Sequence, residues 1–248
     1  MRMREGKAIV RTPSTAEQDY LKQIYLQQEE YGRATTQDLA ARLGVKPPSV
    51  TAMLKHLADD PTGPYVVYTP YHGVELTDKG LAVALEMLRH HRLLELFLAE
   101  LLDMPWDRVH GDAERLEHVL SEELEERIAA KLGHPTYDPH GDPIPGRDGI
   151  IPAQAVRRLV ELAQGESGCV ARITLQDGPV LQYLAGLGVQ PGVQIMVEAV
   201  APFGGVVTLR VATADPTTHS IGESLARHIL VTPCNTVRPE DSGRKHEG

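Results

Sequence analysis

Cysteine is nearly absent from this chain of 248 residues, which contains two, Cys169 and Cys234. Because they are far apart in the sequence, they suggest neither a disulfide framework nor a Cys-rich metal site. Long hydrophobic runs are also lacking: no stretch reaches 18 consecutive apolar residues, which excludes a transmembrane helix. The first residues, MRMREGKAIVRTPS, lack the apolar run of a secretory signal. We therefore expect a protein of the reducing cytoplasm with no membrane partner.

The chain also lacks an excess of positive charge, since its net charge is −9. This sum argues against a general affinity for nucleic acid, but the distribution matters more. Residues 81–133 contain 12 acidic and 6 basic side chains, whereas residues 1–80 contain 10 of each. The first 80 residues are thus neutral overall and can still present a basic face. The length suffices for two or three small domains with real cores.

The N-terminal third carries the pattern of a winged helix. Residues 15–31 place apolar side chains at helical spacing behind a Ser or Thr cap. Two shorter helices follow with a tight turn between them, which is the helix-turn-helix pattern. Thr35 or Thr36 caps the first helix and Gly44 ends it, and Lys46 leads into the second through Pro47–Pro48. Alternating segments at 65–69 and 73–77 predict a β-hairpin. A hairpin after a helix-turn-helix is the winged-helix arrangement, so we expect a DNA-binding domain.

In such a domain the second helix of the helix-turn-helix lies in the major groove. Lys46 and Lys55 are expected to contact phosphates, which set the register of the protein on DNA. Pro47, Ser49 and Thr51 are placed to reach base edges. Because small hydroxyls are weak base readers, DNA shape is expected to supply much of the specificity. The alternative is a winged helix that binds protein.

Residues 81–133 form the acidic, helical part of the chain. The apolar spacing predicts a long helix at about 81–102 and a second at about 107–132, which stops at Gly133. A further pattern lies beside the apolar stripe of the second helix, where four His and Glu side chains share an arc of about 100°. They are His110, Glu114, Glu117 and His118.

A matching pair, His91 and Glu95, lies four residues apart on the first of these helices. If the two helices pack as neighbours, six His and Glu side chains can converge, which is a known way to build a metal site between helices. Imidazole and carboxylate ligands without thiolates suit Mn²⁺, Fe²⁺, Co²⁺ or Zn²⁺. A cation would also offset the cost of burying carboxylates. The alternative is a solvated polar face.

The remaining third changes character. Residues 134–152 are rich in Pro and Gly without periodicity, which predicts an extended linker, and a short helix is expected at about 153–164. Short β-rich runs over 165–233, with a helical piece near 179–186, favour a small five-stranded barrel. The tail after Pro239 is expected to be disordered.

Taken together, these features resemble the DtxR/MntR family of metal-dependent transcriptional repressors over nearly the full length. The resemblance implies a mainly α protein with a small all-β domain: a winged helix-turn-helix, a helical metal-binding and dimerisation domain, and a C-terminal SH3-like (FeoA-like) barrel. The expected divisions are 1–80, 81–150, 151–238 and a tail at 239–248. The carrying segments are STAEQDYLKQIY, PPSVTAMLKHL, HHRLLE, VHGDAERLEHVLSEELEERI, HGDPIPG and the β-rich C-terminal runs.

The resemblance also implies ligands and partners. A homodimer would bind a palindromic double-stranded DNA operator when metal is bound. The primary metal site would use Asp19, Glu114, Glu117 and His118. The ancillary site would use His91, Glu95 and His110, with Asp177 of the barrel as a further candidate.

Two positions bear on the identity of the metal. The iron-sensing branch of the family has Met and Cys where this chain has Asp19 and Glu114, and harder oxygen ligands favour Mn²⁺. The manganese branch known for a two-metal site has Glu at the position of Lys22 and lacks the barrel. A protonated Lys22 cannot ligate, so two closely spaced Mn²⁺ ions are not expected. Fe²⁺ is the second candidate.

The resulting hypothesis is a Mn²⁺-activated repressor of metal-uptake genes, with an Fe²⁺-dependent regulator as the first alternative. A regulator that activates transcription is also open, because the outcome depends on where the operator lies. An alternative of another class is a carboxylate-bridged metalloenzyme. No nucleophile or general base is placed beside a substrate pocket, so we do not expect an enzyme.

Overall fold

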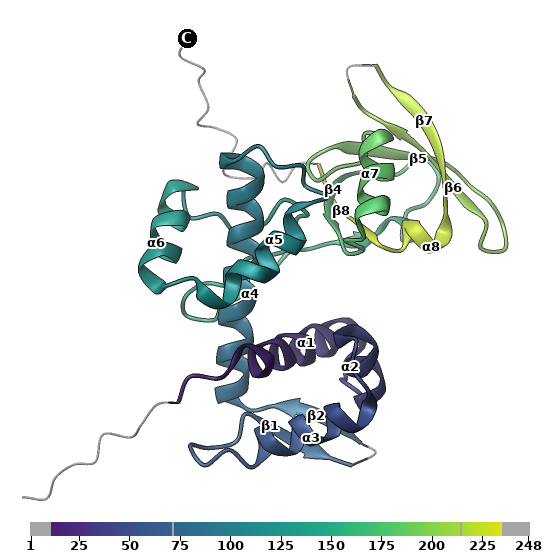
Figure 1. Cartoon of the computed structure of the whole chain (residues 1–248). Coiled ribbons are helices and arrows are strands. Elements are labelled where there is room, and N and C mark those ends of the chain that lie inside the picture. Colours follow the sequence, from purple (N-terminus) through teal and green to yellow (C-terminus); the bar gives the residue numbers. More distant parts are fainter. Residues whose placement is uncertain (1–10, 71, 214, 235–248) are drawn as a thin grey trace, which may run out of the picture. The chain divides into compact units, whose positions relative to one another are not determined.

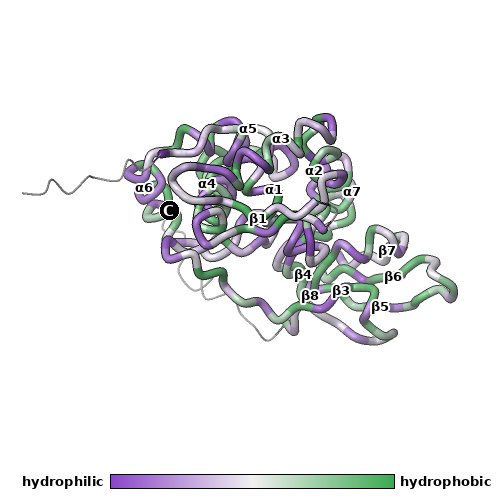
Figure 2. Tube along the Cα trace, turned by 90° about the horizontal axis from the view of Figure 1, so that it is seen from below, coloured by the Kyte–Doolittle hydropathy of each residue, from purple (hydrophilic) through white to green (hydrophobic). Residues whose placement is uncertain are grey.

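The computed structural model describes residues 11–70, 72–213 and 215–234, and Figure 1 shows the order of its helices and strands. Within these residues no helix combines the length and apolar character that crossing a bilayer requires. Figure 2 shows hydrophilic residues interspersed with hydrophobic ones along the chain. Both observations agree with the short apolar runs of the sequence.

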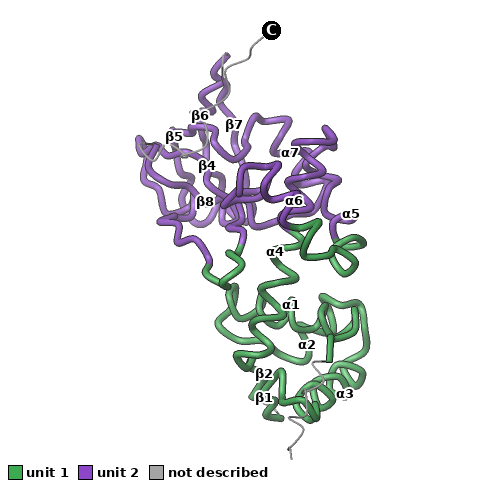
Figure 3. Tube along the Cα trace, turned by 90° about the vertical axis from the view of Figure 1, so that its left-hand side faces the viewer, with its two compact units in different colours: residues 1–91, 114–125, 145–150 green, residues 92–113, 126–144, 151–248 purple. Residues whose placement is uncertain are grey.

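The chain divides into two compact units, coloured in Figure 3. The first unit comprises residues 1–91, 114–125 and 145–150, and the second comprises residues 92–113, 126–144 and 151–248. Each unit thus combines segments that are distant in the sequence, and each is described by itself below.

The first unit contains the winged helix, and its elements confirm the predicted order. Three helices are followed by an antiparallel hairpin whose register pairs Val66 with Leu76. Gly44 ends the second helix in the left-handed region at φ 65°, as a helix C-cap commonly requires. The elements are α1 (Thr15–Tyr31), α2 (Thr36–Leu43), α3 (Pro47–Ala58), β1 (Val66–Thr69) and β2 (Gly73–Leu76).

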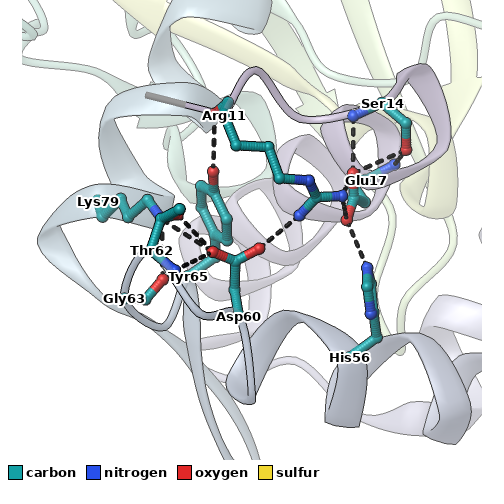
Figure 4. Close-up of polar contacts among 9 residues, drawn as sticks. All are labelled: Arg11, Ser14, Glu17, His56, Asp60, Thr62, Gly63, Tyr65 and Lys79. Atoms are coloured by element: carbon teal, nitrogen blue, oxygen red, sulfur yellow. Dashed lines mark hydrogen bonds and ion pairs between the residues drawn. The ribbon is translucent and has the colours of Figure 1, made fainter. Parts of the chain in front are cut away.

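A polar network joins the start of α1 to the end of α3 (Figure 4). Glu17 closes a capping box with Ser14, whose backbone N–H donates to Glu17 Oε2 at 2.7 Å. Arg11 donates to both Glu17 oxygens, at 2.6 and 2.8 Å, and to Asp60 just beyond α3. His56 Nε2 lies 2.8 Å from Glu17 Oε1. The network therefore fixes the entry of α1 against the C-terminal end of α3.

Replacing Glu17 by glutamine is expected to destabilise the winged helix by about 1–3 kcal/mol at neutral pH, because hydrogen bonds to a charged acceptor are lost. Burial opposes its ionisation, but the Arg11 and Ser14 hydrogen bonds lower the pKa of Glu17 from 4.5 to about 2. The folded-state pKa lies below the unfolded one, so this stabilisation is complete above about pH 4.5 and is lost as the pH falls toward 2. Thermal unfolding of both proteins from pH 2 to 7 measures it. A difference that does not shrink below pH 4.5 contradicts the assignment.

The acidic region begins as predicted with a long helix, α4 (Asp78–Leu101). The single helix predicted over 107–132 is wrong, because three shorter pieces take its place. Leu120 is extended, at φ −69° and ψ 121°, and Ser121 then starts a new helix by accepting the Leu124 N–H at 3.3 Å. A serine that caps a new helix competes with continuing the old one. The pieces are α5 (Val109–Leu116), the 3₁₀ turn η1 (Glu117–Val119) and α6 (Glu122–Lys131).

The second unit contains an antiparallel sheet of six strands in the order β3-β8-β4-β5-β6-β7, where five were predicted. The helix predicted near 153–164 is also wrong, because the two-residue strand β3 and the 3₁₀ turn η2 occupy this stretch. The helical piece near 179–186 is confirmed as α7. The elements are β3 (Arg157–Arg158), η2 (Leu159–Glu161), β4 (Ser167–Ile173), α7 (Gly178–Gly186), β5 (Gln194–Val200), β6 (Val206–Val211), β7 (Thr217–Gly222), α8 (Glu223–Ala226) and β8 (Ile229–Thr232).

The prediction of an extended linker is wrong for residues 134–144, which are packed inside the second unit. Asp138, His140 and Asp142 are buried. The backbone of His140 accepts a hydrogen bond from the Ile173 N–H of β4 at 2.9 Å. The adjacent Gly141, at φ 87°, permits this approach, because a Cβ there would lie 1.9 Å from the Ala171 carbonyl oxygen. The predicted disordered tail lies outside the described residues.

Candidate metal centres

Asp19, Glu117 and His118, here the Asp19 cluster, meet in the first unit. Each offers one potential ligand atom, and these atoms lie within 4.8 Å of one another. His118 Nε2 is 3.1 Å from Asp19 Oδ1 and 3.5 Å from Glu117 Oε1. The other ring nitrogen of His118 lies 2.8 Å from Gln18 Oε1, a partner that orients the imidazole. The α1 helix supplies Asp19, and the η1 turn supplies the other two.

Two cationic or donor groups hold Glu117, which is buried. Lys22 Nζ lies 2.5 Å from Oε1, and His91 Nδ1 lies 2.6 Å from Oε2. Burial opposes ionisation, but the hydrogen bonds and charges of His91 and Lys22 outweigh it and lower the pKa of Glu117. His91, expected in the ancillary site, thus contacts a residue of the Asp19 cluster. The carboxylate is ionised and fixed in one orientation.

Glu114, the fourth expected primary ligand, lies at the end of α5 with an exposed side chain, outside the Asp19 cluster. It is near enough to influence that cluster electrostatically. Burial is the main cause of the raised pKa of Asp19, opposed by His118 and Lys22 and reinforced by the charges of Glu117 and Glu114. The α-helix ends at Leu116, just before Glu117, which explains why Glu114 and Glu117 do not share one continuous helical face.

The second unit holds another group of ligand-type side chains, Glu95, Asp138 and His140, here the Asp138 cluster. All three are buried, and their potential ligand atoms lie within 4.8 Å of one another. His140 Nδ1 is 3.7 Å from Glu95 Oε2, while Glu95 Oε1 is 3.1 Å from Nδ1 of His110. The other nitrogen of His140 lies 3.0 Å from the Trp106 carbonyl oxygen. His140 therefore turns Nδ1 toward the two carboxylates.

The Asp138 cluster has the electrostatics of an incompletely compensated buried site. Asp138 Oδ2 makes no hydrogen bond, and Arg92 Nε lies 3.9 Å from it. Burial and the neighbouring Asp142 and Glu95 raise the pKa of Asp138 to about 8. Burial opposes the charge on His140, but Glu95 and Asp138 raise its pKa to about 9. A bound divalent cation would compensate these carboxylates, so the donor set fits a metal ion.

Sequence reasoning missed Asp138 and His140 as candidate ligands, because Pro and Gly made their segment look like a linker. The available signal was the spacing of Asp138, His140 and Asp142, three ligand-type residues at every second position. Asp177, the candidate from the barrel, is exposed at the N-cap of α7 and joins no ligand cluster of the described residues. Its neighbour Gln176 instead donates to Asp142 Oδ2 at 2.6 Å.

The proposed reading helix, α3, presents its polar residues to solvent. Lys46, Pro47, Ser49 and Lys55 are exposed, while Thr51 is half-buried. The Thr51 hydroxyl donates to the Pro47 carbonyl within the helix at 3.2 Å, which makes it a weaker reader of bases.

Comparison with known proteins decides the family. The N-terminal DNA-binding domain of iron-dependent repressors matches residues 13–74, and their metal-binding and dimerisation domain matches residues 77–146. A FeoA domain matches residues 157–233. The chain belongs to the DtxR/MntR family of metal-dependent transcriptional regulators. Members of this family are DNA-binding repressors rather than enzymes, and the predicted domain types are confirmed.

Individual relatives of this regulator differ in the metal that they name. The iron-dependent repressor IdeR of Mycobacterium tuberculosis is 36% identical over 200 residues, covering 75% of this chain and 85% of the relative. A manganese-dependent transcriptional repressor in complex with manganese is 40% identical, with a TM-score of 0.81, covering 88% of this chain and 99% of that one. The IdeR structure of T. acidophilum is 30% identical, with a TM-score of 0.72, covering 90% and 100%.

Proposed function

We propose that this regulator is a Mn²⁺-activated repressor and that the Asp19 cluster is its regulatory metal site, with Glu114 as an added ligand. The carrying observation is the convergence of Asp19, Glu117 and His118 without a thiolate. Carboxylate and imidazole ligands suit Mn²⁺, and the solved manganese-dependent repressor is 40% identical. Fe²⁺ is the second candidate, because the same ligands accept it and the IdeR relatives are iron-dependent.

The geometry supports a simple mode of control. Asp19 belongs to α1, a helix of the winged-helix domain, whereas Glu117 and His118 belong to η1. A bound cation supplies a shared positive charge, and these three residues would hold it. Their joint contacts favour one orientation of α1 from an ensemble, and we propose that this orientation is the DNA-binding one. DNA must then strengthen metal binding by the same factor.

We further propose an ancillary metal site around Glu95. In the second unit one oxygen of this carboxylate faces His110 and the other faces His140, and Asp138 and His140 are the added candidates for ligands. His91 lies one turn before Glu95 on α4. Such a site would stabilise the buried segment that carries Asp138 and His140, because it compensates their charge.

The proposed target is a palindromic double-stranded operator that a homodimer binds in the cytoplasm, controlling metal-uptake genes. The exposed Lys46 and Lys55 would contact phosphates, while Pro47 and Ser49 face the base edges, with a smaller part for Thr51. The matched dimerisation domain supports the two-fold arrangement, since a symmetric dimer reads two half-sites.

DNA-binding curves measured metal by metal test this function. A DNA fragment is first selected from a random pool by repeated binding to the full chain with Mn²⁺. Its affinity is then measured with Mn²⁺, Fe²⁺, Zn²⁺ or excess chelator. We expect tight binding with Mn²⁺ and at least about a 100-fold loss in chelator, a coupling within the usual range. Anomalous scattering from Mn²⁺ crystals then locates the ions. An operator affinity in excess chelator equal to that with Mn²⁺ would contradict the proposal.

A further inference from the structure

The two cysteines, far apart in the sequence, lie close together in the second unit. In the register of β4 with β8, Cys169 is paired with Thr232, and Cys234 follows two residues later. Because β8 ends at Thr232, Cys234 lies two residues beyond the strand position that faces Cys169. Both thiols are free and half-buried.

The local packing brings the two thiols near enough to interact. After burial, the Cys169 thiol is the main cause of the raised pKa of the Cys234 thiol. The adjacent Gly168 permits the strands to approach, because a Cβ there would meet the Thr232 carbonyl oxygen at 3.1 Å. Strand pairing thus supplies a proximity that the distance between the cysteines in the sequence conceals.

We propose that Cys169 and Cys234 form a peroxide-sensitive dithiol that closes into an intramolecular disulfide. In the first step a Cys169 thiolate attacks hydrogen peroxide, which forms the sulfenic acid and releases water once the departing hydroxide takes up the thiol proton. In the second step the Cys234 sulfur attacks that sulfenic sulfur and a second water leaves. Overall, two thiols lose two electrons and two protons, and one peroxide is reduced to two waters.

The order of attack follows from the surroundings of Cys234. Burial and the neighbouring Cys169 thiol raise the pKa of the Cys234 thiol to about 11, so it stays protonated at neutral pH. Because the thiolate is the nucleophile, Cys234 is the resolving residue and Cys169 the peroxide-reactive one. The product disulfide would join the end of β8 to the neighbouring strand β4.

The test uses the full, reduced chain in chelator with hydrogen peroxide as the only oxidant. We expect the loss of both thiols, a fall of about 2 Da in intact mass, and a monomeric band on a non-reducing gel, all reversed by dithiothreitol. The two single substitutions separate the roles. Cys234→Ser is expected to accumulate a dimedone-reactive sulfenic acid at Cys169, whereas Cys169→Ser is expected to react at least about 10-fold more slowly.

Three outcomes would overturn the proposal. One is a wild-type chain that retains both thiols under peroxide. Another is a mass increase from added oxygen without a disulfide. The third is a disulfide formed only between chains. Because Cys234→Ser keeps the reactive residue, it remains informative if Cys169→Ser does not fold.

Discussion

Glu117→Gln is expected to raise the Mn²⁺ concentration needed for half-maximal operator binding by at least about 100-fold. Glu117 is the fully buried carboxylate of the Asp19 cluster, and an amide cannot supply its charge. Removing a residue that only orients a metal ligand lowers metal affinity 10- to 100-fold. Removing the charge of a ligand is therefore expected to lower metal affinity by at least about 100-fold. Operator binding across a Mn²⁺ titration measures the shift.

The exposed Glu122 offers a matched control, because Glu122→Gln makes the same chemical change at a side chain that is 82% exposed. Its titration is expected to match the unchanged protein. Glu117→Gln also leaves the buried Lys22 without its counter-charge, which can unfold the protein. The double variant Lys22→Met with Glu117→Gln removes both charges together. If the double variant folds and needs the same Mn²⁺ concentration as the unchanged protein for half-maximal operator binding, Glu117 is not a ligand.

Gly141→Ala is expected to destabilise the second unit by about 3 kcal/mol or more, a loss typical of severe steric overlap in a packed region. The added Cβ would lie 1.9 Å from the Ala171 carbonyl oxygen, and backbone at that distance must move. The movement separates residues 138–142 from β4, so the Asp138 cluster should also lose its order. Denaturant unfolding and the ancillary metal stoichiometry measure the two effects.

Gly133→Ala separates this overlap from backbone strain. Gly133 has a similar φ of 80°, but a Cβ there meets nothing within 4 Å. Its substitution is expected to cost about 1 kcal/mol, the usual penalty for placing alanine in the left-handed region. Equal losses at Gly133 and Gly141 would show that the close approach of the buried segment to β4 contributes nothing.

The winged helix was predictable because its signals are local. The start of α1, the Gly44 end of α2 and the turn between the two strands each depend on a few neighbouring residues. Asp19, a candidate ligand on one of these elements, was identified through the family resemblance. Local caps and turns agree here with the fold, which makes prediction from sequence effective.

The errors arose where local and non-local signals compete. Ser121 is compatible with the interior of a helix or with the cap of a new one, and in the structure it caps α6. The preceding residues Glu117 and His118 then lie in a 3₁₀ turn. The Pro and Gly around His140 indicate a linker locally, although the segment is held by β4, a strand about 30 residues later. The proximity of the two cysteines is likewise non-local, since only the register of β4 with β8 reveals it.

Lys22 and His91 hold the side chain of Glu117 in place. The Asp19 cluster therefore contains one immobilised carboxylate, Glu117, and one more exposed carboxylate, Asp19. The Glu117 side chain is fully buried, whereas that of Asp19 is 37% exposed. Immobilising a side chain costs roughly 0.5–1.5 kcal/mol, and for Glu117 this ordering is complete when the chain folds. An arriving ion would thus meet one carboxylate that is already ordered, Glu117, and one that can still change its conformation, Asp19. Because Asp19 belongs to α1, its movement toward the ion would also move α1.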